Sequence, residues 1–166
     1  MTRKIFCYSV LIGACVGLGS AEPLIKNGEF EKPLAPWKLF SIKDTPATDR
    51  AVADGVLTIK AADASGKPGN RQLIQEVAVE AGRTYSLSFD IKGDLEKGKE
   101  VVVVVTTGPG KFAYFNRVPI TADWTSKKLR ITPKETDGTD APTLKFLLGD
   151  LKGDVSLRKV SLEATE

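Results

Sequence analysis

The chain has 166 residues, of which 24 are lysine or arginine and 21 are aspartate or glutamate, and it contains no histidine. The absence of histidine excludes the Ser-His-Asp and Cys-His systems of nucleophilic catalysis and the usual zinc sites. Any catalysis would therefore depend on carboxylates, lysine or tyrosine.

Residues 1–21 are typical of a secretory signal peptide, because a basic start is followed by an apolar stretch and a small-residue cleavage site ending at Ala21. The apolar stretch is shorter than the roughly 20 residues of a membrane-spanning helix, so we expect no transmembrane segment. Residues 12–15 also resemble a lipoprotein box that would leave Cys15 as a lipidated first residue. We expect a secreted, periplasmic or cell-envelope protein, with a lipoprotein as the alternative.

Residues 22–166 are expected to form one domain that is held together by packing alone. Both cysteines, Cys7 and Cys15, lie in the signal segment, so the remaining chain cannot form a disulfide. Removing Arg3 and Lys4 from the 24 basic residues leaves 22 basic residues against 21 acidic residues. Such a balance does not favour nucleic acid as a partner, and we expect a monomer.

The dominant pattern along the chain is an alternation of apolar and polar residues, which is typical of strands with one buried face. It predicts a hairpin in which residues 73–79 and 84–92 are joined by a turn at 80–83. Residues 101–107 are apolar on both parities, as expected for a central strand covered on both faces or for a strand at the midpoint of a curved sheet. Further strands are expected at 56–60, 143–148 and 155–162. Many short strands and no amphipathic helix predict an all-β fold, a sandwich of two antiparallel sheets.

Several motifs, in this order, resemble the carbohydrate-binding modules attached to bacterial cellulases and xylanases. They are Asn27-Gly28-Glu29-Phe30-Glu31, Trp37, the segment 75–89 with Gly82 and Tyr85, Trp124, Leu148-Gly149, and the segment 153–162. The resemblance covers nearly all of residues 22–166 and implies a jelly-roll β-sandwich of the galactose-binding-like type. It also implies a non-catalytic domain whose concave sheet binds single polysaccharide chains, and both tryptophans in the core.

A glycan site needs exposed aromatic rings for the flat faces of sugars and polar groups for their hydroxyls. Segment 111–117 carries both, because Phe112, Tyr114 and Phe115 are followed by Asn116 and Arg117. On a regular strand Phe112 and Tyr114 point to one face and Phe115 to the other, so at least one ring should be exposed. The candidate ligand-binding residues are Tyr114, Phe112, Asn116, Arg117, Arg71 and Lys92. An aromatic sheet edge without a ligand is the alternative interpretation.

Gln75 matches a position of the family but shares its parity with apolar residues, so we expect it to be buried and hydrogen-bonded. Two further functions stay open. A glycoside hydrolase would need a pair of carboxylates, for which Glu29, Glu31 and Asp90 are available, although no pattern selects a pair. A structural or adhesive module of the cell envelope would bind protein instead.

The related modules often hold a structural calcium ion away from the groove, through acids of the opening motif and an acid close to the last valine of the final strand. Here the two residues before Val160 are Arg158 and Lys159. Because cations repel calcium, which takes oxygen ligands, we expect no metal site. We expect an ion pair between Glu31 and Lys159 to join the first and last strands instead.

Overall fold

The computed structural model describes residues 23–31, 34–42, 48–64 and 66–165, and within these ranges the chain forms strands and one short 3₁₀ helix. The elements are β1 (Lys38–Ser41), β2 (Thr48–Ala53), β3 (Val56–Ala61), η1 (Pro68–Asn70), β4 (Arg71–Glu76), β5 (Tyr85–Lys97), β6 (Glu100–Thr106), β7 (Phe112–Pro119), β8 (Thr125–Ile131), β9 (Thr143–Leu147) and β10 (Lys152–Ala164). The predicted signal segment, residues 1–21, lies outside the described residues.

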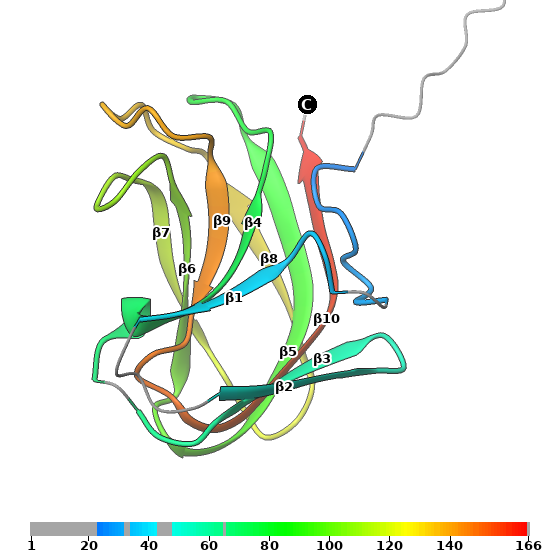
Figure 1. Ribbon diagram of the computed structural model, residues 1–166. Helices are drawn as coiled ribbons and strands as arrows, with labels where there is room; N and C mark the ends of the chain where they lie inside the picture. The colour runs from blue at the N-terminus through cyan, green and yellow to red at the C-terminus, as the bar shows by residue number, and fades with distance from the viewer. Residues whose placement is uncertain (1–22, 32–33, 43–47, 65, 166) are drawn as a thin grey trace, which may run out of the picture.

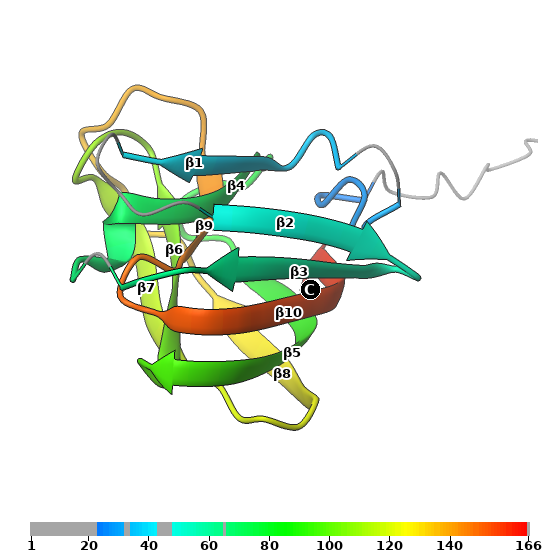
Figure 2. The ribbon, with the colours of Figure 1, turned by 60° about the horizontal axis from the view of Figure 1, so that its bottom comes forward.

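The strands form two five-stranded sheets that pack face to face (Figure 1). The first sheet has the order β1-β4-β9-β6-β7, and the second has the order β2-β3-β10-β5-β8, whose strands can be followed in Figure 2. Every paired strand is antiparallel to its neighbour. The predicted all-β jelly-roll sandwich of two antiparallel sheets is confirmed.

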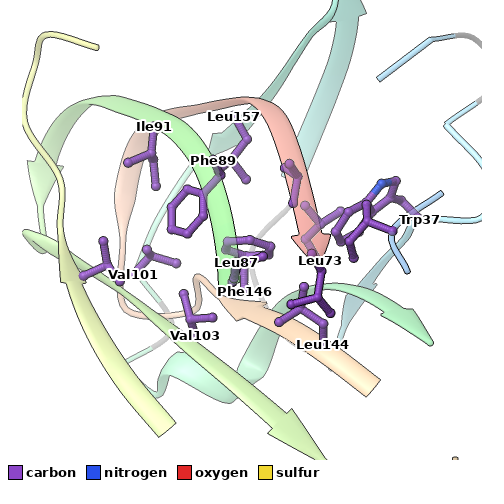
Figure 3. Close-up of a cluster of buried hydrophobic side chains, with 14 of the residues drawn as sticks. Trp37, Leu73, Leu87, Phe89, Ile91, Val101, Val103, Leu144, Phe146 and Leu157 are labelled. Carbon is purple, nitrogen blue, oxygen red and sulfur yellow. The ribbon is translucent and has the colours of Figure 1, made fainter. Parts of the chain in front are cut away.

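The core lies between the sheets and is filled by the apolar parity of each strand. On β5, Tyr85, Leu87, Phe89 and Ile91 are all buried, as their alternation with polar residues predicts. Phe89 meets Phe146 of the facing sheet edge-on, with ring centroids 5.2 Å apart (Figure 3). Such contacts across the sandwich fix the spacing between the two sheets, because cores are close-packed.

Strand β6 is buried on both parities, as its run of valines predicts. Val101, Val103 and Val105 belong to the main core, while Val102 and Val104 form a second small cluster with Leu147 of β9. The second cluster lies on the outer face of the first sheet. One strand therefore supplies both the core and the middle of that outer face.

The predicted hairpin between residues 73–79 and 84–92 is wrong. Strand β4 pairs with β1 and β9 in the first sheet, whereas β5 pairs with β10 and β8 in the second. The turn at 80–83 therefore crosses from one sheet to the other. A hydrogen bond of 2.8 Å from the Glu80 amide to the Tyr85 hydroxyl closes the crossing.

The opening motif packs against the last strand, where β10 has an irregularity between Arg158 and Ser161. The Val160 amide donates to the Gly28 carbonyl at 3.0 Å, and a Cβ atom added to Gly28 would lie 1.9 Å from the Val160 carbonyl oxygen. Only glycine fits at this crossing. The Asn27 side chain accepts a hydrogen bond of 2.7 Å from the Glu31 amide and donates one of 3.1 Å to the Ala35 carbonyl.

The expected ion pair between Glu31 and Lys159 is wrong, since the ion pairs of the described residues do not include it. Lys159 lies in the irregularity with a φ of 54° and is exposed. Arg158 instead pairs with Asp90 of β5, with its Nε atom 2.9 Å from Oδ2. The bulge turns Arg158 rather than Lys159 toward a carboxylate.

The two tryptophans differ in location. Trp37 is buried in the core, as expected. Its ring is tilted against that of Phe30, with centroids 5.7 Å apart, and its indole nitrogen donates to the Asn27 carbonyl at 3.1 Å. Trp124 is only half-buried and lies on the outer face of the second sheet. Its ring lies 4.2 Å from the Arg158 guanidinium and 5.1 Å from the Lys92 ammonium, so its expected place in the core is wrong.

Candidate functional site

The outer face of the first sheet carries the candidate site, and its composition follows from the strand register. Residues paired across antiparallel strands point to the same face. One row across the sheet contains Lys38, Ile74, Lys145, Val104 and Phe115, and the next contains Phe40, Gln72, Leu147, Val102 and Arg117. This face thus combines aromatic rings at both edges with an aliphatic middle and a few polar groups.

A groove of about 450 Å³ crosses this face obliquely from the β1 edge to the β7 edge. Its strand residues are Phe40, Gln72, Ile74, Val104, Thr106, Phe112, Thr143, Lys145 and Leu147, and its rims are Gly69, Gly108, Pro109, Gly110 and Asp140. The volume is in the range of ligand pockets. The groove belongs to the outer side of the sheet, so the core described above forms its support.

Two exposed phenylalanines lie at opposite ends of the groove. Phe40 of β1 is 47% exposed and Phe112 of β7 is 51% exposed, so both rings are accessible to a ligand in the groove. Ile74, Val104 and Leu147 form the floor between them. Two flat rings and an aliphatic floor suit the C–H faces of a chain of sugar rings.

Polar groups are distributed along the same groove. Gln72 donates to the Gly69 carbonyl at 2.5 Å, and Thr143 donates to the Ala141 carbonyl at 3.1 Å, so both side chains are held in place. Amide and hydroxyl groups that are already oriented can offer their remaining donors and acceptors to a ligand without a further loss of freedom.

The groove contains one cation and one carboxylate among its described lining residues, Lys145 and Asp140. Lys145 is half-buried in the floor, between Ile74 and Val104 in its row. Burial lowers the pKa of Lys145 from its usual value, and the nearby Asp140 carboxylate opposes this shift. Neither side chain forms an ion pair or a hydrogen bond within the described part of the chain.

The aromatic side chains of β7 are distributed between the two faces of the sheet differently from the expectation. Phe115 pairs with Val104 of β6, and Tyr114 pairs with Val105. Phe112, not Ala113, pairs with the next residue, Thr106, so the register shifts at this point. The extra residue, Ala113, is a β-bulge that reverses the parity. Phe112 and Phe115 therefore share the outer face, with ring centroids 6.3 Å apart, whereas Tyr114 packs against the core. The expectation that at least one of these rings is exposed is confirmed.

The other candidates of this segment also divide between the two faces. Asn116 pairs with the core residue Val103 and donates to the Tyr114 hydroxyl at 3.2 Å, so it lies on the inner side with Tyr114. Arg117 lies on the outer face beside the groove, 3.7 Å from Glu100 and 5.7 Å from the ring of Phe115. Phe112 and Arg117 are thus the segment's candidates on the groove face. Contact with a glycan at any of these positions stays a prediction.

The structure does not bring Arg71 or Lys92 to the groove. Arg71 is fully buried, and its guanidinium donates to the carbonyls of Leu148, Leu151 and Asp63. Burial lowers the Arg71 pKa from its usual value, with Asp63 opposing. Lys92 lies on the second sheet over Trp124. Each of the two would be out of reach of a ligand in the groove.

Gln75 behaves as expected. It is buried and exchanges two hydrogen bonds with the Lys26 backbone, accepting from the amide at 2.7 Å and donating to the carbonyl at 2.9 Å. This amide fastens the amino-terminal segment to β4.

The residues that the sequence analysis missed are Phe40, Gln72, Asp140 and Lys145. Gln72 and Lys145 occupy the polar parity of strands whose apolar parity was recognised, so their common face could have been noticed. Phe40 gives no such signal, because only its pairing with Gln72 places it on this face.

A calcium site of the kind that the resemblance implies does not fit these residues. Glu29 and Glu31 of the opening motif are exposed, and Arg158 and Lys159 lie in the part of β10 that packs against it. No group of three or more acidic, cysteine or histidine side chains that could hold a metal ion occurs among the described residues. Likewise, none of the described helices is long and apolar enough to cross a membrane.

Comparisons with known proteins agree with this architecture. A family model for a carbohydrate binding domain matches residues 22–152. A solved CBM4 structure is 22% identical, covers 85% of this chain and 99% of its own, and superposes with a TM-score of 0.72. The second amino-terminal cellulose-binding domain of β-1,4-glucanase C from Cellulomonas fimi is 25% identical, with coverages of 90% and 98% and a TM-score of 0.69.

The fold is also similar to that of a protein with a different activity. A Stig cyclase from Fischerella sp. TAU is 14% identical, covers 86% of this chain and 96% of its own, and has a TM-score of 0.66. No curated protein matches the chain. Because the family model matches most of the sequence, the chain belongs to the carbohydrate binding domain family.

Proposed function

We propose that the groove on the outer face of the first sheet binds a segment of a single polysaccharide chain, without catalysis. The observation that supports this most is the pair of exposed rings, Phe40 and Phe112, at opposite ends of a groove with an aliphatic floor. Sugar rings would stack on these side chains. Their hydroxyls would meet Gln72, Thr143 and Asp140.

The choice of the first ligand rests on a relative. The Cellulomonas fimi domain, which is 25% identical, is a cellulose-binding domain of a β-1,4-glucanase. A soluble β-1,4-glucan is therefore the first polymer to test, followed by xylan. Such a polymer is long and thin, as a groove that crosses a whole sheet requires.

Affinity electrophoresis in gels that contain the polymer tests the proposal with the purified protein. Phe40→Ala and Phe112→Ala should each weaken binding roughly tenfold, because each removes about 1–2 kcal/mol of apolar contact. Ile42→Ala is the matched control, since Ile42 is exposed to a similar extent at the end of β1 but does not line the groove. Equal retardation of all three variants and the unchanged protein would refute the groove as the binding site.

The hydrolase alternative has less support. Glycoside hydrolysis by the usual mechanisms requires two carboxylates on opposite sides of the scissile bond, and Asp140 is the one carboxylate among the described residues that line the groove. Asp90 lies on the other sheet. Release of reducing sugar by the purified protein, abolished in Asp140→Asn, would establish catalysis.

We also propose that the protein is exported and acts outside the cytoplasm as a monomer. The signal-like residues 1–21 support export, and the family match begins at residue 22, next to the predicted cleavage site. Amino-terminal sequencing of the exported protein distinguishes cleavage after Ala21 from lipidation at Cys15. Size-exclusion chromatography tests whether the protein is a monomer. If affinity purification recovers a protein ligand and no glycan binds, the adhesive envelope module is favoured instead.

A further inference from the structure

The charged residues of the groove bear on which glycans it could bind. Between Phe40 and Phe112, the charged side chain of the floor is Lys145, in a lining that the strands otherwise supply with apolar, amide and hydroxyl groups. Lys145 is on β9, the central strand of the sheet, so its ammonium group rises from the middle of the groove. Any chain lying across the groove must pass this cation.

No carboxylate forms an ion pair with Lys145 among the described residues. The residues beside it in its row are Ile74 and Val104, both apolar. A half-buried ammonium without an ion pair is less stable than one in water, because burial removes part of its hydration. Burial lowers the pKa of Lys145, and the Asp140 carboxylate, which is near but not in an ion pair with it, opposes this shift.

Asp140 does not supply the missing partner. It lies in the loop before β9, beside the Gly108 end of the rim, and no ion pair joins it to Lys145 among the described residues. Two other cations of the region are already paired, Lys111 with Asp137 at 2.6 Å and Arg117 with Glu100 at 3.7 Å. Lys38 and Glu76, which have opposite charges, line a separate hollow at the β1 margin.

We infer that the groove selects glycans that carry an acidic substituent, a carboxylate or a sulfate ester, which pairs with Lys145 over the centre of the floor. The inference rests on the proposed glycan-binding function and deepens it. A charge-assisted hydrogen bond between ammonium and oxyanion replaces the water that Lys145 lost. Asp140, at the rim, accepts hydrogen bonds from sugar hydroxyls and disfavours an anion placed at that end.

The test compares polymers that differ only in charge. The purified protein is titrated calorimetrically with a uronic-acid polysaccharide and its carboxyl-reduced form, and with a sulfated polysaccharide and its desulfated form. The acidic member of one pair should bind at least about tenfold more tightly at low salt, as expected for one charge-assisted hydrogen bond. The pair that shows the difference identifies the substituent as carboxylate or sulfate. The preference should weaken as salt is added.

Variants assign the preference to one side chain. Lys145→Met should remove the preference, and Lys145→Arg should keep it, because the charge is retained. Lys38→Met is the matched control on the same face and should keep it too. Circular dichroism and thermal melts establish that each variant is folded.

Two results would overturn the inference in different ways. Equal affinity for acidic and neutral members of both pairs, or an unchanged preference in Lys145→Met, would refute it while glycan binding stands. Absence of binding to every polysaccharide, including soluble β-1,4-glucan, would refute the proposed function and the inference together.

Discussion

Asp90 offers a sharp test of the electrostatics that stabilise the second sheet. Its side chain is 13% exposed, and it accepts a hydrogen bond of 2.6 Å from Ser126 on β8 and one of 2.9 Å from Arg158 on β10. The carboxylate therefore joins both strands that flank β5. We expect Asp90→Asn to keep an acceptor for Ser126 but to lose the ion pair with Arg158.

The size of the effect follows from the burial of the pair. A hydrogen bond to a charged group contributes about 1.5–3 kcal/mol, but Arg158 is 34% exposed, so solvent screens part of this. We expect Asp90→Asn to lower the free energy of unfolding by about 1–2 kcal/mol at pH 7. For a domain of this size that corresponds to roughly 3–6 °C in Tm.

The pH dependence separates charge from packing. The Ser126 hydrogen bond, helped by Arg158, lowers the pKa of Asp90 below its usual 3.8. A group whose pKa is lowered by folding stabilises the fold fully above its unfolded pKa, and this contribution is lost as the pH falls through the folded pKa. The difference between the unchanged protein and Asp90→Asn should thus be constant from pH 7 to about 5 and shrink below about pH 4.

Urea unfolding followed by tryptophan fluorescence, repeated from pH 7 to 2.5, measures both quantities. Asp94→Asn is the matched control, because Asp94 lies on the same face of β5, is exposed and has no ion pair among the described residues. It should change stability by less than about 0.5 kcal/mol. A loss in Asp90→Asn that is the same at pH 7 and pH 2.5 would refute the electrostatic explanation.

Two further substitutions test the packing of the chain ends and the role of a buried cation. Gly28→Ala should destabilise the domain by about 3 kcal/mol or more, because its Cβ would lie 1.9 Å from the Val160 carbonyl oxygen; an unchanged Tm would contradict the close approach. Arg71→Met should cost about 1–3 kcal/mol by removing the donor to the Leu151 carbonyl and one of the two donors to the Leu148 carbonyl, which keeps the Leu151 amide, while the affinity of the folded fraction for a glycan stays the same. Urea unfolding and affinity electrophoresis measure the two quantities, and a lower affinity of folded Arg71→Met would return Arg71 to the binding site.

The alternation of apolar residues predicted strands and core well but could not assign strands to sheets. Period two tells which face of a strand is buried, and Tyr85, Leu87 and Phe89 are buried as expected. It carries no information on the partner strand. The segments around residues 73–79 and 84–92 look like a hairpin because a four-residue turn separates them, yet that turn crosses the sandwich.

The candidate site was predicted less completely than the core. A β-bulge changes which side chains of a strand share a face, and the sequence of one strand does not show which residues of its neighbours pair with it. Ala113 shifts the parity of β7, so Phe115 rather than Tyr114 shares the outer face with Phe112. Arg71 was expected on the polar parity of its strand, but it is buried, and three carbonyl acceptors make its burial tolerable. The parity of its strand places Lys145 on the exposed face, but Phe40 joins this face only through its pairing with Gln72 of β4.

Strand β6 is buried on both of its faces, which makes the floor of the groove rigid. The valines that pack into the core alternate with Val102 and Val104 on the outer face, and Val104 lines the groove, so the floor cannot shift without disturbing the core. A floor that is already formed spares a ligand the cost of ordering it. If glycans bind in the groove as proposed, discrimination among them should arise where the lining departs from an aliphatic surface, at its rings, its amide and hydroxyl groups, and its two charged residues, Asp140 and Lys145. Of these groups only Asp140 and Lys145 are charged, and Lys145 alone lies in the floor, so its replacement should change the choice of glycan as well as the strength of binding.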